Sequence, residues 1–147
     1  MKQALALEIM LSGENVFLTG AAGSGKTFTL NQFIQYAKNE GKKISVTATT
    51  GLAATHLGGN TIHSWSGMGI YDFLPNKFIE RLSKSRLEII KNTDILIIDE
   101  ISMLHDFRLD LVDQICRAVR QDFNRPFGGI QVILCGDFFQ LPPINRA

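Results

Sequence analysis

The stretch that decides the fold runs Val16-Phe17-Leu18-Thr19-Gly20-Ala21-Ala22-Gly23-Ser24-Gly25-Lys26-Thr27. Residues 16–19 read as a short buried strand, and residues 20–27 fill every required position of the phosphate-binding loop pattern. Beyond the loop, apolar residues recur at helical spacing, which predicts a helix to about residue 39. The order strand, glycine-rich turn, helix is the context in which this motif binds phosphate.

Each position of this loop has a physical role. Gly20, Gly23 and Gly25 allow positive φ and close backbone approach, so the amides of residues 20–25, including Ala21, Ala22 and Ser24, can point inward as an anion nest. Lys26 is expected to reach the β- and γ-phosphates of ATP, and the Thr27 hydroxyl to bind Mg²⁺. The alternative is a glycine-rich turn without a ligand, but Lys-Thr directly after the last glycine has no packing rationale.

A second motif is the apolar run Ile95-Leu96-Ile97-Ile98, which ends in Asp99 and Glu100. Four apolar residues without alternation are typical of a parallel strand buried on both faces. Ligands bind at the carboxyl ends of such strands, so we expect Asp99 to hold Mg²⁺ and Glu100 to orient or deprotonate the attacking water. The alternative, a carboxylate that caps a following helix, explains one of the two acidic residues only.

Composition narrows the class of protein. The 147 residues suffice for one domain, 45% of them are hydrophobic, and a net charge of +1 provides no global field for nucleic acid or anionic lipid. Cys116 and Cys135 have no metal-binding spacing and are expected to be buried, which suits a reducing compartment. No signal peptide or membrane-spanning segment is apparent, so an intracellular location is expected. The basic stretch 77–91 is interpreted as a solvated helix exterior, with a DNA contact as the alternative.

The pattern of strands and helices predicts an α/β fold. We expect strands at about 16–19, 44–48, 94–98 and 130–135, and helices at 4–11 (amphipathic), 51–57, within 76–91 and at 106–121, the last with Asp106 as N-cap. Residues 58–69 are expected to form a loop. Strands that alternate with helices indicate a parallel, doubly wound sheet between helical layers.

Residues 44–70 contain no charged side chain other than histidine. Thr50 and Gly51 stand where a strand ends and a helix begins, a place that presents N–H groups and hydroxyls to a phosphodiester backbone. His63 and Ser64 lie in Gly-Gly-Asn-Thr-Ile-His-Ser-Trp at 58–65, which adds donors and an aromatic plane suited to single-stranded DNA. Trp65 could equally anchor this segment to the core.

A last motif, Gly-Asp-Phe-Phe-Gln-Leu-Pro-Pro at 136–143, follows the final expected strand. Gln140 is placed to contact the γ-phosphate from a neighbouring strand end, and a neutral amide there can respond to the presence of that phosphate. Asp137 could support the magnesium site. The alternative is a proline-stiffened exit loop.

Together these strings, with Thr-Ala-Thr-Thr-Gly-Leu-Ala-Ala at 47–54 and Asp-Glu-Ile-Ser-Met at 99–103, resemble the N-terminal RecA-like motor domain of the petite integration frequency (PIF) family of DNA helicases. These are superfamily 1B enzymes related to the RecD helicases, and the resemblance extends over essentially all 147 residues. It implies an ATP-driven motor that moves 5′ to 3′ on single-stranded DNA in repair, recombination or telomere and G-quadruplex maintenance. It also implies that Gln3 reads adenine, that Thr50 and His63 line the DNA track, and that Gln140 couples phosphate state to movement.

The resemblance further implies a second RecA-like domain, which this sequence does not contain. In such motors that domain supplies arginines, and an arginine finger is worth roughly 10³–10⁵ in rate. We therefore expect this chain, a monomeric half-motor, to bind nucleotide weakly, to hydrolyse it slowly or not at all, and to unwind nothing. A non-enzymatic, nucleotide-switched module for single-stranded DNA is the competing hypothesis. A small-molecule kinase is disfavoured because no lid with clustered arginines is present.

Overall fold

The computed structural model describes residues 3–20, 26–69, 71 and 73–137. This part of the chain contains a five-stranded sheet in the order β1-β5-β4-β2-β3, and all neighbouring strands run parallel. The strands are β1 (Val16–Gly20), β2 (Ile44–Ala48), β3 (Asn60–Thr61), β4 (Ile95–Asp99) and β5 (Gln131–Asp137).

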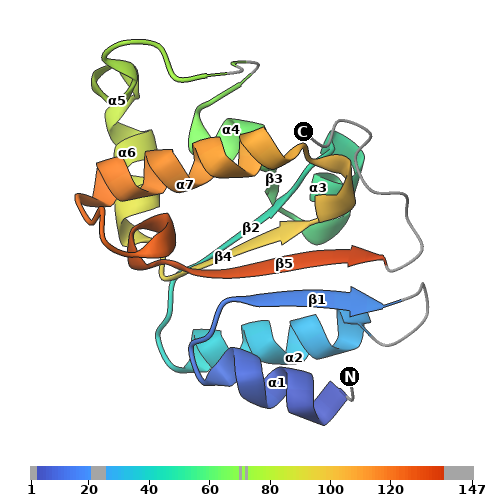
Figure 1. Ribbon diagram of the computed structural model, residues 1–147. Coiled ribbons are helices and arrows are strands. Elements are labelled where there is room, and N and C mark those ends of the chain that lie inside the picture. Colours follow the sequence, from blue (N-terminus) through green and yellow to red (C-terminus); the bar gives the residue numbers. More distant parts are fainter. Residues whose placement is uncertain (1–2, 21–25, 70, 72, 138–147) are drawn as a thin grey trace.

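Helices cover both faces of this sheet (Figure 1), with α1 and α2 on one face and α4, α6 and α7 on the other. The α-helices are α1 (Gln3–Leu11), α2 (Lys26–Asn39), α3 (Gly51–Leu57), α4 (Ile62–Ser66), α5 (Phe78–Arg81), α6 (Lys84–Asn92) and α7 (Asp106–Arg120). Two 3₁₀ turns, η1 (Ile101–Met103) and η2 (Pro126–Gly129), precede and follow α7. The predicted α/β class with a parallel sheet between helices is confirmed. None of the described helices is long and apolar enough to cross a membrane.

The core explains why β4 has no polar alternation. Ile95 and Ile97 pack into a cluster with α1 and α2, whereas Leu96 and Ile98 pack into a second cluster with α4 and α7. Each of these four side chains is at most 3% exposed. The interpretation of the apolar run as a strand buried on both faces is therefore confirmed.

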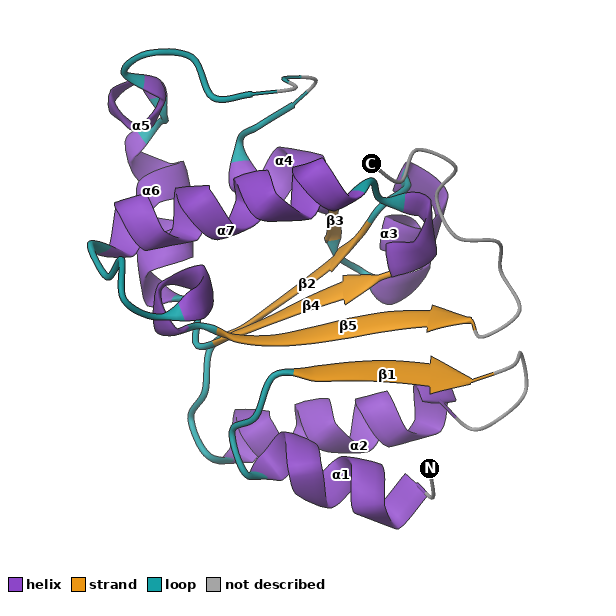
Figure 2. Cartoon of the chain, in the orientation of Figure 1, coloured by secondary structure: helices purple, strands orange, loops and turns teal. Residues whose placement is uncertain are grey.

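The register brings the predicted motifs to one edge of the sheet. Ala48, at the end of β2, is paired with Asp99 of β4 and with Thr61 of β3. At the other side, Gly20 of β1 is paired with Asp137 of β5. The carboxyl ends of all strands thus point the same way (Figure 2), which places the start of the phosphate loop and the carboxylates at a common edge.

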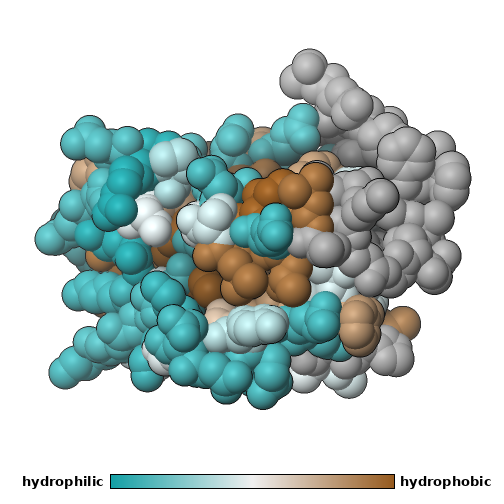
Figure 3. Space-filling view, turned by 90° about the horizontal axis from the view of Figure 1, so that it is seen from below, coloured by the Kyte–Doolittle hydropathy of each residue, from teal (hydrophilic) through white to brown (hydrophobic). Residues whose placement is uncertain are grey.

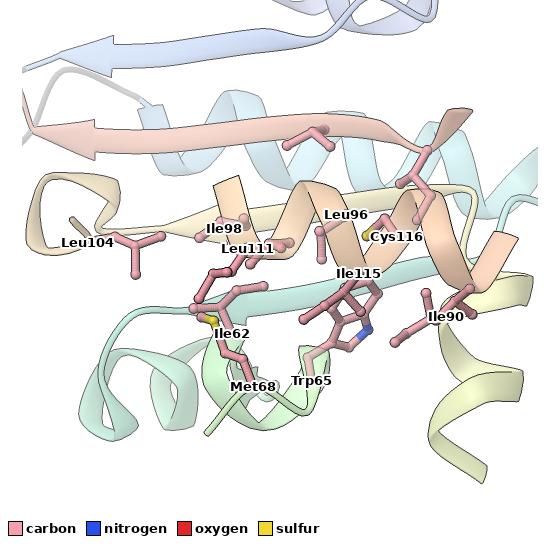
Figure 4. Packing of buried hydrophobic residues seen from close by; sticks show 14 of the residues in the cluster. Ile62, Trp65, Met68, Ile90, Leu96, Ile98, Leu104, Leu111, Ile115 and Cys116 are labelled. Carbon is pink, nitrogen blue, oxygen red and sulfur yellow. The ribbon is translucent and has the colours of Figure 1, made fainter. Parts of the chain in front are cut away.

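The expectation of a loop over residues 58–69 is wrong. The segment contains β3 and α4, and Thr61 caps α4 by accepting a hydrogen bond from the Ser64 N–H at 3.2 Å. Trp65 is 2% exposed and packs with Ile62 and Met68 against α7 (Figure 4), so the core alternative for its indole is correct. Burial of these apolar side chains stabilises a helix that is too short to form alone.

Two other helices differ in detail from expectation. A helix was expected within 76–91, and the structure has two there, because Leu82 adopts an extended conformation (φ −69°, ψ 144°) after α5 and Ser83 then caps α6. The expectation that Asp106 is the N-cap of α7 is also wrong. His105 occupies that position, without a side-chain cap bond, and Asp106 is the first helical residue.

The first helix lies where it was predicted but is not amphipathic. Ala6 and Met10 are buried, yet Leu5 and Leu11 on the same helix are 50% and 46% exposed. Figure 3 looks at the side of the molecule that carries α1 and α2, and hydrophobic residues are exposed in the middle of it. The α1 helix is therefore apolar on most sides, which is typical of a fully buried helix. In this structure only the face that carries Ala6 and Met10 packs against the core.

Candidate functional site

The phosphate-binding motif spans the junction between β1 and α2. Gly20 is the last residue of β1 and Lys26 the first of α2, as the motif predicts. Thr27 lies in the first turn of α2 and is exposed at the carboxyl edge of the sheet. Residues 21–25, the Lys26 side chain and Gln140 lie outside what the structure describes. Gln3 begins α1, but its side chain also falls outside the description.

The two candidate carboxylates occupy the end of β4. Asp99 Oδ1 accepts a hydrogen bond from the backbone N–H of Glu100 at 2.8 Å. Glu100 itself adopts the left-handed conformation, with φ 56° and ψ 44°, which is uncommon for a residue with a side chain and clusters at functional sites. Glu100 immediately precedes η1, but its side chain makes no cap bond. Capping therefore does not explain this carboxylate.

The end of β2 holds Glu100 through two threonines. The Thr49 hydroxyl donates to the Glu100 backbone carbonyl at 3.0 Å, and the Thr50 hydroxyl donates to Glu100 Oε1 at 3.2 Å. Thr50 also caps α3, because its Oγ1 accepts the Ala53 N–H at 3.2 Å. The predicted general base and the first predicted DNA contact are thus in direct contact.

The candidate ligands are too few to bind a metal ion by themselves, but they suit Mg²⁺ bound together with a nucleotide. Within the described ranges, no three residues of the types His, Cys, Asp and Glu form a cluster that could hold an ion. Mg²⁺ is normally bound by one or two protein ligands together with substrate phosphates and water. Asp99 at the strand end and the exposed Thr27 hydroxyl both offer oxygen atoms, the ligand type that Mg²⁺ requires.

The remaining predicted DNA contacts lie at the same edge. Ala48 and Thr61 are paired across the adjacent parallel strands β2 and β3. Thr50 comes two residues after Ala48, and His63 comes two residues after Thr61. Ser64 is exposed, and a Cβ at Gly51 would meet nothing within 4 Å. Burial, and secondarily the nearby Arg108 charge, lowers the pKa of His63 from its ordinary value. The neutral form of the imidazole is therefore favoured.

Sequence reasoning missed Thr49. This residue fixes the Glu100 carbonyl, and its own N–H donates to the Asp99 carbonyl at 3.3 Å. The signal that could have found it is the tandem Thr49-Thr50 directly after an expected strand. Its partner, however, lies 51 positions away along the chain.

With this geometry established, comparison with known proteins identifies the family. The family model described as PIF1-like helicase matches residues 1–147. The chain belongs to the PIF1-like helicase family. Among curated relatives of the family, ATP-dependent DNA helicase Pif1 of Psychrobacter sp. (strain PRwf-1) is 54% identical over 147 residues, covering 99% of this chain and 22% of the relative.

Solved Pif1 structures share the fold. The crystal structure of Pif1 helicase from Candida albicans has a TM-score of 0.85 and 42% identity, covering 97% of this chain and 33% of that one. A Bacteroides Pif1 helicase in complex with ADP-AlF3 and single-stranded DNA has a TM-score of 0.80 and 39% identity, covering 99% of this chain and 34% of that one. The expected RecA-like architecture is confirmed, and the PIF1-like chain spans about a fifth to a third of the length of these relatives.

Proposed function

We propose that this chain is the ATP-binding motor domain of an ATP-dependent DNA helicase that moves 5′ to 3′ on single-stranded DNA. The observation that carries the proposal is the Asp99-Glu100 pair at the end of a fully buried parallel strand, at the same sheet edge as Gly20. Family membership supports it, because the chain resembles a Bacteroides Pif1 solved in complex with ADP-AlF3 and single-stranded DNA.

ATP binding is assigned to residues 20–27. Their amides donate hydrogen bonds to the phosphates and the Lys26 ammonium offsets part of the phosphate charge, while Gln3 contacts adenine and Gln140 the γ-phosphate. Thr27 and Asp99 would hold Mg²⁺, which neutralises charge that develops on the phosphate oxygens. Glu100 is the general base: it accepts a proton from the attacking water, and such a base contributes typically about 10²–10⁴ in rate.

Single-stranded DNA is assigned to the edge formed by Thr50, Gly51, His63 and Ser64. These residues offer hydroxyl, amide and imidazole groups without net positive charge, so they can bind a DNA backbone irrespective of base sequence. A second RecA-like domain would complete both the ATP cleft and the DNA track, and the protein acts as a monomer. Its location is inside the cell, where its DNA substrate lies.

Steady-state ATP hydrolysis tests the proposal. A two-domain protein containing this sequence should hydrolyse ATP and respond to single-stranded DNA, whereas the 147-residue chain alone should bind Mg-ATP with little turnover. Lys26→Ala should abolish thermal stabilisation by Mg-ATP. A two-domain protein that binds ATP and DNA without turnover would favour the non-enzymatic switch instead, and stabilisation retained in Lys26→Ala would refute the loop assignment.

A further inference from the structure

The contact between Thr50 and Glu100 has a defined direction. A carboxylate only accepts, so the Thr50 hydroxyl must be the donor in its 3.2 Å bond to Glu100 Oε1. The Thr50 Oγ1 atom also accepts the Ala53 N–H at 3.2 Å. Thr50 and Glu100 are both only partly buried.

The strand order determines where this bond directs the carboxylate. The sheet runs β1-β5-β4-β2, so Glu100, which follows β4, has β2 on one side and β5 with β1 on the other. Thr50 follows β2, whereas the phosphate loop follows β1. A Glu100 side chain bonded to Thr50 is therefore drawn to the side of β4 that lies away from the phosphate loop.

A hydroxyl carries a single proton to donate. Thr50 can give that proton to Glu100 or to a phosphate oxygen of bound DNA, but not to both at once. We propose that Thr50 is a positioning residue that couples DNA binding to ATP hydrolysis: without DNA it holds Glu100 away from the attacking water, and a DNA phosphate that accepts the Thr50 proton releases Glu100. This coupling rests on the proposed function, since it takes Glu100 as the base and Thr50 as a DNA contact.

The test is Thr50→Val in the two-domain protein, with ATP turnover measured without DNA and at saturating single-stranded oligothymidylate. Removing the restraint should raise the DNA-independent kcat by about 10- to 100-fold, the range that one hydrogen bond to a charged group typically represents. The KM for ATP should stay unchanged, and the ratio of stimulated to unstimulated kcat should fall by the same factor. Thr50→Ala, which removes the same hydroxyl, should reproduce the rise if Thr50→Val folds poorly.

Two controls separate this role from a structural one. Thr50→Ser keeps both the donor and the cap and should behave as wild type. Ser83 caps α6 in a comparable way, because its hydroxyl accepts the Arg86 N–H at 3.1 Å. Ser83→Ala removes this cap and should leave the DNA-independent kcat unchanged. If Thr50 served only as a helix cap, its loss would lower kcat and not raise it.

The outcomes are distinct. DNA-independent turnover that is unchanged or reduced in Thr50→Val and Thr50→Ala, in a wild-type protein that DNA stimulates, would overturn the coupling and leave the proposed function intact. A rise in Thr50→Ser equal to that in Thr50→Val would also overturn it, because the hydroxyl would then be irrelevant. A wild-type protein whose ATPase ignores single-stranded DNA would overturn the proposed function and the coupling together.

Discussion

Gly59 is the residue whose substitution gives the sharpest test of how the sheet edge is built. A Cβ placed on Gly59 would lie 2.0 Å from the Val46 carbonyl oxygen and 2.9 Å from its carbonyl carbon. Ordinary contact begins at 3.4 Å, so Gly59→Ala requires a displacement of about 1.4 Å (3.4 minus 2.0). The obstacle is backbone, and no side-chain rotation can relieve it.

The strand that yields must be β3. Val46 is paired with Ile97 on its other side within a five-residue ladder, whereas β3 pairs with β2 through two residues only. Displacing β3 would also shift α4, which carries buried Ile62 and Trp65 together with His63. Overpacking of this kind typically costs about 1–3 kcal/mol, which for a domain of this size lowers Tm by about 2–12 °C.

Thermal unfolding followed by circular dichroism, with and without single-stranded DNA, measures this effect. Gly51→Ala is the matched control, because a Cβ there meets nothing within 4 Å and the residue is helical, so a small gain in stability is expected. We expect Gly59→Ala to lower both the stability of the protein and its affinity for DNA, although Gly59 has no side chain that could contact DNA. A Tm within 1 °C of Gly51→Ala would refute the reasoning from backbone contact.

Five further predictions concern four single residues. Glu100→Gln should lower turnover by about 10²–10⁴ while Mg-ATP binding survives; turnover near wild type in a quench assay would exclude Glu100 as base. His63→Ala should weaken single-strand binding at pH 7.5 without changing the slope of log Kd against log salt, because the lowered pKa of His63 leaves it uncharged; a shallower slope in fluorescence anisotropy would contradict this. The same lowered pKa means that the unfolded chain binds the proton first as pH falls below 6.5, so unfolding free energy should decline there, and less steeply in His63→Asn. Cys116 should resist alkylation in the native protein at pH 8, since burial raises the pKa of its thiol to about 12; mass spectrometry of iodoacetamide-treated protein checks this. Arg120→Ala should lower unfolding free energy in urea, because its guanidinium donates to the carbonyls of Gly128, Lys91 and Thr93 at 2.8, 2.7 and 3.0 Å; an unchanged midpoint would show these bonds to be dispensable.

The elements that sequence predicted well are those decided by local periodicity. The Ile95–Ile98 run has neither alternation nor helical spacing, and only a strand buried on both faces accommodates it. The strand and helix on either side of residues 21–25 were predicted for a similar reason, because the glycines and Lys-Thr of the motif stand at fixed offsets between them. Both motifs could therefore be assigned to the carboxyl edge of a parallel sheet from the sequence alone.

The elements that sequence missed depend on tertiary contacts. Residues 62–66 have no helical propensity beyond the Thr61 cap, and α4 forms because Ile62 and Trp65 bury against α7. The break between α5 and α6 is a similar case, since nothing in Leu82-Ser83 forbids a continuous helix except that Ser83 also makes a good cap. The Thr50–Glu100 bond joins residues 50 positions apart, and only the strand register reveals it.

That register has a mechanical consequence for the two proposed sites. Ala48 opposite Asp99 is the last paired position of β2 and β4, and the chain continues directly into Thr49-Thr50 on one strand and Glu100 on the other. The hydroxyls of both threonines then bond to Glu100, and the Thr49 N–H bonds to the Asp99 carbonyl, so Glu100 is held directly beside the end of the ladder. No flexible segment separates the proposed DNA contact from the proposed base, so a shift of Thr50 toward a phosphate must change the hydrogen bonding of Glu100. Glu100 has a left-handed backbone conformation that is sparsely populated, and these hydrogen bonds keep it there. Glu100 is therefore the residue of the site that is most sensitive to what Thr50 contacts.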